Sequence, residues 1–150
     1  MIYGIDTGFL VSVEHAEHPD RAAACTTLSR LLADGDRLAV APQVIAEFIH
    51  VVTDPHRFRQ PAGASSARLA ARNWWTARQV DHVFPDEETV RQFLDRLDRL
   101  KLGRKRLLDT LLAATYHRAG IRSLLTTNPD DFRAFDCFDL ITPSSMIARP

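Results

Sequence analysis

Short apolar runs divide the chain at regular intervals, and each run has the length and composition of a buried β-strand. The runs are residues 2–5, 38–41, 80–84, 124–127 and 140–141. Asp6, Thr7 and Gly8 follow the first run and predict a turn. The segment 128–131 follows the fourth run and predicts another turn.

Between these runs, apolar residues recur at three- and four-residue spacing, which is typical of helices that bury one face. The pattern predicts helices over residues 20–34, 42–52, 65–78, 86–100 and 106–118. Asp20 and Asp86 stand where side chains cap a helix, and Gly103 and Gly120 stand where helices end. The segment 53–63 is rich in Pro, His and Arg and predicts a loop.

Strands that alternate with helices predict an α/β fold, in which a mainly parallel central sheet of four to five strands is sandwiched by helices. The 150 residues fit one compact domain, so we expect residues 1–150 to form a single unit. Hydrophobic residues make up 45% of the chain, which is enough to build a core without disulfide or metal staples.

The charges of the chain cancel, because 19 Lys and Arg residues balance 19 Asp and Glu residues. This balance argues against a histone-like nucleic-acid binder, so any nucleic-acid contact must come from a local patch. Cys25 and Cys137 lie far apart without metal-ligand spacing, and we interpret them as small buried hydrophobes, with a single disulfide left open. The chain shows no signal-peptide pattern and no membrane-spanning run, so we expect a cytoplasmic protein without membrane contact.

Several acidic side chains occupy positions where their negative charge needs a positively charged partner. Asp6 directly follows the first strand and Asn128 a late one, and the carboxyl ends of parallel strands share one edge of a sheet. Glu47 and Asp109 lie in nearly all-apolar helical stretches, where an ionised carboxylate is costly unless a partner compensates it. For each acid alone, an arginine in a structural ion pair explains the position as well as a metal does. Three acids beside the Asn-Pro-Asp-Asp turn together favour a divalent cation, since Mg²⁺ and Mn²⁺ prefer oxygen ligands.

Four segments that carry these residues resemble the motifs of PIN domains, and specifically those of VapC toxin ribonucleases. The segments are residues 5–7 with Asp6, 42–48 with Glu47, 108–114 with Asp109, and 125–132 with Asn128 and Asp131. Each motif is short, but four of them in this order over nearly the whole chain make a specific resemblance.

The resemblance implies a metal-dependent endoribonuclease that hydrolyses RNA phosphodiester bonds as the toxin of a type II toxin–antitoxin pair. It implies catalytic roles for five residues: Asp6, Glu47, Asp109, Asn128 and Asp131. Asp6 and Asp109 would hold Mg²⁺ or Mn²⁺, and Glu47 would orient the attacking water or ligate a second ion. The resemblance further implies a single-stranded or looped RNA substrate, a small antitoxin partner and a homodimer.

Two positions depart from the family pattern. Gly8 stands where many relatives carry Ser or Asn, which removes a side chain that could orient Asp6 or a bound water. Asn128 is neutral, so a second metal would be held more loosely than at an all-acid site. One tightly bound ion is therefore expected.

Basic residues just before Asp109 are candidates for RNA binding, namely Arg104, Lys105 and Arg106. Earlier members of the same cluster, Arg96 and Arg99, alternate with acids and are interpreted as a solvated helix face.

Aromatic and histidine residues suggest a partner surface more than a second metal site. Trp74 and Trp75 cannot face the same way on a helix, so we expect one in the core and the other at a partner surface. His15 and His18 are interpreted as loop residues, because nothing in the sequence completes a tetrahedral zinc set with them.

Two other functions fit parts of the sequence. A phosphotransfer domain could use Asp6 as its nucleophile, but such sites need a neighbouring second acid and a Lys at a late strand end, which the residues after Asp6 and before Asn128 do not supply. A non-catalytic RNA-binding or scaffold module of the same fold is the other alternative, although it would have no need of three acids.

Overall fold

The strands of the protein form one sheet in which all neighbours are parallel. The computed structural model describes residues 1–145, and its five strands follow the order β3-β2-β1-β4-β5. They are β1 (Ile2–Ile5), β2 (Arg37–Val40), β3 (Val80–His82), β4 (Ser123–Leu125) and β5 (Asp139–Ile141). The predicted α/β fold with a mainly parallel sheet of four to five strands is confirmed.

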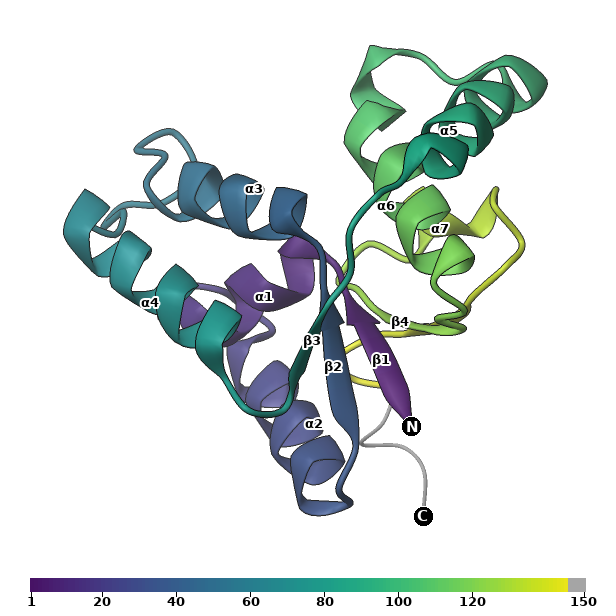
Figure 1. Ribbon diagram of the computed structural model, residues 1–150. Coiled ribbons are helices and arrows are strands. Elements are labelled where there is room, and N and C mark those ends of the chain that lie inside the picture. Colours follow the sequence, from purple (N-terminus) through teal and green to yellow (C-terminus); the bar gives the residue numbers. More distant parts are fainter. Residues whose placement is uncertain (146–150) are drawn as a thin grey trace.

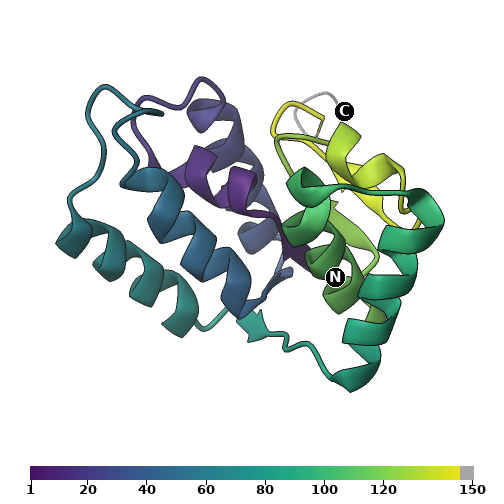
Figure 2. The same cartoon turned by 90° about the horizontal axis from the view of Figure 1, so that it is seen from above.

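Helices cover both faces of this sheet. They are α1 (Thr7–Glu14), α2 (Arg21–Ala33), α3 (Pro42–Val52), α4 (Ala64–Thr76), α5 (Glu87–Leu100), the 3₁₀ turn η1 (Arg104–Arg106), α6 (Leu107–Arg118) and α7 (Asp130–Arg133). Helices α1 to α4 lie on one side of the sheet, and α5 to α7 lie on the other (Figures 1 and 2). None of the helices in the described residues is long and apolar enough to cross a membrane.

The position of α6 is set by a close contact between Tyr116 and the two central strands. The buried Tyr116 hydroxyl lies 2.8 Å from the carbonyl oxygen of Ile5 and 2.9 Å from that of Ala39. Its ring passes directly over Gly4, where an added Cβ would lie 2.9 Å from a ring carbon. Only glycine leaves room for this approach, and the contact fixes where α6 begins relative to the end of β1.

Most of the predicted elements are present, with one omission. The turn expected over residues 6–8 is wrong, because α1 starts at Thr7 directly after the first strand. This short helix buries residues on several sides, including Thr7, Phe9, Leu10, Val11 and Ser12, so it lacks the one-sided apolar stripe that reveals a helix in a sequence. The expected turn over 128–131 is replaced in part by the single-turn helix α7.

Helix α5 begins as predicted but does not bury its whole apolar face. Asp86 caps it through a reciprocal capping box with Thr89. Val90 and Leu94 remain 45% and 52% exposed, whereas Arg96 is buried. The interpretation of Arg96 as solvated is therefore wrong: its guanidinium lies 2.9 Å from His117 Nδ1 and stands over the Phe135 ring.

Candidate active site

The strand order brings the first and fourth sequence motifs together. Strands β1 and β4 are neighbours, and the backbone N–H of Asp6 donates to the carbonyl of Leu125 at 2.9 Å. A cavity of about 450 Å³ opens at this edge of the sheet. All five acidic and amide residues proposed from the sequence line it, and we call them the acid wall: Asp6, Glu47, Asp109, Asn128 and Asp131.

Asp6 is the most buried member of the acid wall, with 7% of its surface exposed. Its Oδ2 accepts a hydrogen bond from Thr126 Oγ1 at 2.9 Å, and the same hydroxyl accepts one from the backbone N–H of Asn128 at 3.0 Å. Burial raises the pKa of Asp6 to about 7, and the negative charges of Asp109 and Glu47 add to the rise, against the bond from Thr126. The carboxylate is thus held in place but poorly compensated.

Glu47 is oriented by the helix that the sequence did not reveal. Thr7 Oγ1, at the first position of α1, donates to Glu47 Oε2 at 2.8 Å. Helix α3 delivers Glu47 to the cavity because its other face packs in the core through Val44, Phe48 and Val51. Within residues 1–145, neither Asp6 nor Glu47 forms an ion pair with Lys, Arg or His.

Asp109 lies in the first turn of α6, beside an arginine. Its Oδ2 is 3.7 Å from Arg106 Nε. Burial raises the pKa of Asp109 to about 6, the charges of Asp131 and Glu47 add to this, and Arg106 opposes it. The arginine therefore offsets only part of the repulsion around Asp109.

The three basic residues proposed for RNA binding separate in the structure. Lys105 lines the cavity, whereas Arg104 is exposed and is not part of the lining. Arg106 turns toward the acid wall, where its guanidinium donates to Asp131 Oδ1 at 2.9 Å and also to the Asp131 carbonyl. In this arrangement Arg106 positions two acids of the site, so its expected contact with RNA stays a prediction.

The environment of Gly8 explains one departure from the family pattern. A Cβ at this position would lie 2.5 Å from Thr127 Oγ1 and 3.3 Å from Asp6 Oδ2. The threonine after β4 thus occupies the space that a side chain at position 8 would need. The neighbouring Thr126 supplies the hydrogen bond to Asp6 that a residue at position 8 could have made.

The cavity lining also includes three residues, on two connecting loops, that the sequence did not single out as functional. They are His18, between α1 and α2, and Arg57 and Phe58, between α3 and α4, and we call them the loop wall. For Arg57 and Phe58 the only signal was the Arg- and His-rich composition of residues 53–63, and His18 is one of the two histidines interpreted above as loop residues. A loop of that composition has no periodicity from which the direction of a side chain could be read.

The chemistry of the acid wall fits a divalent cation, although its side chains do not form a finished ligand set. Within residues 1–145, no three Asp, Glu, His or Cys side chains meet closely enough to hold a metal as they stand. The donors that face the cavity are nevertheless carboxylate and amide oxygens, the ligands that Mg²⁺ and Mn²⁺ prefer. Burial, together with the neighbouring acids, raises the pKa values of Asp6 and Asp109, so a bound cation would relieve both effects.

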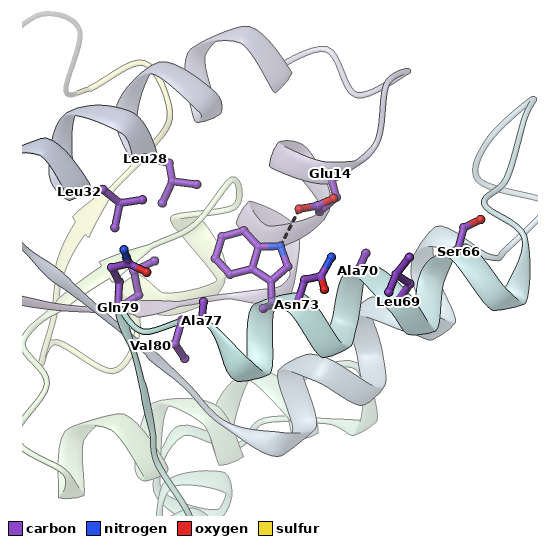
Figure 3. Close-up of a pocket in the computed structure, with 12 residues that line it drawn as sticks. Glu14, Leu28, Leu32, Ser66, Leu69, Ala70, Asn73, Ala77, Gln79 and Val80 are labelled. Atoms are coloured by element: carbon purple, nitrogen blue, oxygen red, sulfur yellow. Dashed lines mark hydrogen bonds between the residues drawn. The ribbon is translucent and has the colours of Figure 1, made fainter.

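Away from this site, two apolar grooves flank α4. One has a volume of about 430 Å³ and is lined by Leu28, Leu32, Leu69 and Trp74, whose indole N–H donates to Glu14 Oε1 at 2.6 Å (Figure 3). The other contains Trp75, which stacks on the His82 ring at 3.8 Å. Trp74 is buried and Trp75 partly exposed, as expected for neighbours on one helix.

Cys25 and Cys137 are free, half-buried thiols.

Comparison with known proteins identifies the family of the chain. The family model of the PIN domain matches residues 3–136, which is most of the sequence. This chain is a PIN domain protein. Comparison with curated proteins gave no match.

Solved structures with the same fold come from several bacteria. Mycobacterium tuberculosis VapC20, described as a Sarcin-Ricin loop cleaving toxin, is 17% identical with a TM-score of 0.63, covering 89% of this PIN domain protein and 95% of that chain. VapBC-1 from nontypeable Haemophilus influenzae is 19% identical with a TM-score of 0.67, and the match covers 97% of this protein and 100% of that chain. A toxin–antitoxin complex from Klebsiella pneumoniae is 18% identical with a TM-score of 0.62, and the match covers 94% of this protein and 97% of that chain.

Proposed function

We propose that this PIN domain is a metal-dependent endoribonuclease that acts as the toxin of a type II toxin–antitoxin pair. The observation that supports this most is the acid wall, in which oxygens from four distant segments line one cavity beside the carboxyl ends of β1 and β4. The similar VapC20 is described as a Sarcin-Ricin loop cleaving toxin.

In this proposal, Asp6 and Asp109 hold Mg²⁺ or Mn²⁺, and Glu47 lies on the same cavity. When bound, the cation supplies Lewis acidity toward water and the scissile phosphate. Glu47, held by Thr7, accepts a hydrogen bond from the attacking water and aims it at phosphorus. The Asn128 amide would donate to a phosphate oxygen at the rim, Asp131 would accept a hydrogen bond from a water, and Arg106 keeps Asp131 in place.

A cleavage assay tests this function directly. Purified protein is incubated with a labelled single-stranded RNA in Mg²⁺ or Mn²⁺, with and without EDTA, and the products are separated by size. We expect cleavage in the divalent ion and none in EDTA, with recovery when excess ion is returned. Cleavage that persists in EDTA would overturn the metal-dependent mechanism. Cation binding by calorimetry without any RNA cleavage would favour another metal-dependent reaction, and the absence of both would favour a scaffold.

We further propose a small antitoxin as the partner, because one of the similar structures is described as a toxin–antitoxin complex. The groove in Figure 3 is an apolar concavity next to the exposed Leu69, the kind of feature that a helix or extended segment of a partner covers. Leu69 is 60% exposed, so Leu69→Asp should leave the fold intact. We expect it to weaken binding of the product of an adjacent small reading frame while RNA cleavage is unchanged; undiminished binding would place the partner elsewhere.

A homodimer completes the proposal. Four apolar side chains on α5 and at the start of α6 are 40–52% exposed: Val90, Leu94, Leu107 and Leu108. We propose that a second copy of the chain covers these exposed side chains. Sedimentation should give twice the mass of 16.9 kDa, and Leu94→Asp should shift it toward the monomer. A monomeric wild-type protein at high concentration would contradict the dimer.

A further inference from the structure

The loop wall of the cavity has a chemistry that differs from the acid wall. His18, Arg57 and Phe58 contribute a hydrogen-bond donor, a cation and an aromatic ring to the lining that also contains Asp6 and Glu47. An RNA strand that approaches the acids carries negative phosphates, which the acids repel. A neighbouring cation and ring are the groups that would hold such a strand.

The two loops that carry these residues are tied to each other. The Phe58 ring stacks on the His15 ring with centroids 3.6 Å apart and an interplanar angle of 16°. The backbone N–H of Gln60 donates to Glu17 Oε2 at 3.0 Å. Figure 2 shows the two connecting loops at the same corner of the molecule. The loop wall is thus one unit, although its members lie about forty positions apart in the sequence.

Phe58 offers a surface for stacking. His15 is 7% exposed and covers one face of the Phe58 ring, which is itself only partly buried. Phe58 also packs against the hydrophobic core, and it is part of the cavity lining. An aromatic ring with one face supported by the protein and part of its surface open is a platform for an unpaired nucleobase.

Arg57 is available for a phosphate. Its side chain is 59% exposed, and its one ion pair among the described residues joins Nε to Asp54 Oδ2 at 3.5 Å. The turn does not depend on this ion pair, because Asp54 already accepts the backbone N–H of His56 at 2.8 Å and that of Arg57 at 3.1 Å. The terminal nitrogens of the guanidinium therefore remain as donors for a phosphate oxygen.

His18 presents a defined donor. Its Nδ1 accepts the backbone N–H of Asp20 at 3.2 Å, which places the proton of the neutral ring on Nε2. Burial lowers the pKa of His18, and the neighbouring His15 lowers it further, against the charge of Asp20, so the ring is neutral near neutral pH.

We propose that the loop wall binds the nucleotide next to the scissile phosphate, with its unpaired base stacked on Phe58, a phosphate on Arg57, and a sugar–phosphate oxygen on His18 Nε2–H. This inference rests on the nuclease function proposed above and adds the residues that select the substrate. A base paired in a duplex cannot stack on Phe58, so the loop wall selects single-stranded RNA.

Binding and cleavage are measured separately to test this. Binding uses the Asp6→Asn variant in EDTA with a short single-stranded RNA that contains 2-aminopurine, followed by fluorescence at several salt concentrations. Phe58→Leu keeps an apolar side chain against His15 but removes the ring; we expect at least about fivefold weaker binding and loss of the 2-aminopurine quenching. Arg57→Gln should lower the slope of log affinity against log salt by about 0.7, the value of one phosphate contact on a single strand.

Arg59→Gln is the matched control, because Arg59 is exposed in the same loop but does not line the cavity. It should leave both the quenching and the salt slope as they are. In the Asp6 background, quenching and slope that are unchanged in Phe58→Leu and Arg57→Gln would overturn the inference even if the wild-type protein cleaves RNA. A wild-type protein that neither binds nor cleaves RNA would instead overturn the nuclease function. Equal binding of duplex and single-stranded RNA would overturn the selection of single-stranded RNA by Phe58.

Discussion

The two walls of the cavity are built in different ways. The acid wall stands largely on regular elements: Asp6 follows the central strand β1, Glu47 lies in α3, and Asp109 lies in the first turn of α6, which Tyr116 ties to β1 and β2. The loop wall stands on two connecting segments joined by a ring stack and by one hydrogen bond from a backbone N–H to a side-chain carboxylate. Mutually repelling charges need a rigid frame, whereas a surface that receives a flexible strand can stand on loops. We therefore expect the rate of RNA cleavage to depend on residues of the acid wall and the affinity for RNA to depend on residues of the loop wall.

The largest expected effect comes from removing an acid from the acid wall. Asp6→Asn and Asp109→Asn should each lower the rate of RNA cleavage by about a hundredfold or more, because each removes a charge that holds the cation. The measurement is single-turnover cleavage in saturating Mg²⁺. The control is Asp130→Asn, because Asp130 directly precedes Asp131 of the acid wall but does not line the cavity. Its side chain is 85% exposed and forms an ion pair with Arg133. Full activity of both acid variants would dismiss the assignment.

The acid wall should also make the metal-free protein sensitive to pH. The pKa of Asp6 rises from 3.8 to about 7 on folding, so this group stabilises the fold at low pH and loses that contribution as pH rises through 7. The free energy of unfolding in EDTA should therefore fall by about 3 kcal/mol between about pH 5 and pH 8. Asp109, with a pKa of about 6, acts in the same direction.

Urea titrations at the two pH values measure this effect. Asp6→Asn should flatten the profile and make the metal-free protein at least as stable as the wild type at high pH. Mg²⁺ should raise wild-type stability at high pH more than at low pH. A metal-free protein that gains stability as pH rises, or an Asp6→Asn variant with a sharp loss, would point to a structural ion pair instead.

A smaller effect is expected where the acid wall meets the threonines after β4. Gly8→Ser would bring Cβ to within 2.5 Å of Thr127 Oγ1, so we expect a loss of about 2 kcal/mol in unfolding free energy. Thr127→Ala makes room, and the double variant should recover most of the loss. Additive losses in the double-mutant cycle would mean that the clash is relieved by some other movement.

The smallest effect on stability is expected in the loop wall. Phe58→Leu loses the ring stack with His15 but keeps an apolar contact, so the free energy of unfolding should fall by about 1 kcal/mol or less. Thermal unfolding of Phe58→Leu and of Gly8→Ser under the same conditions compares how much stability each wall loses. A larger loss in Phe58→Leu than in Gly8→Ser would mean that the loops are as integral to the fold as the strands.

Most of the fold could be predicted because strands and one-sided helices leave a periodic trace in the sequence. Helix α1 could not, since its buried residues lie on several sides and no side chain caps its start. The exposed face of α5 could not either, because periodicity shows that Val90 and Leu94 share a face but not whether that face meets the core. The acids could be proposed from their apolar surroundings, while the roles of Thr7, Thr126 and Arg106 depend on contacts across the chain.

The sequence alone determined which segments become strands, and hence that Asp6 and Asn128 meet at one edge of a parallel sheet, because local pattern governs secondary structure and parallel pairing aligns strand ends. Only the tertiary structure decided what surrounds those residues. Arg106 turns toward Asp131, and the loop that carries Phe58 packs against His15. Contacts between segments far apart in the sequence arise from packing, and packing leaves no periodic trace in either segment.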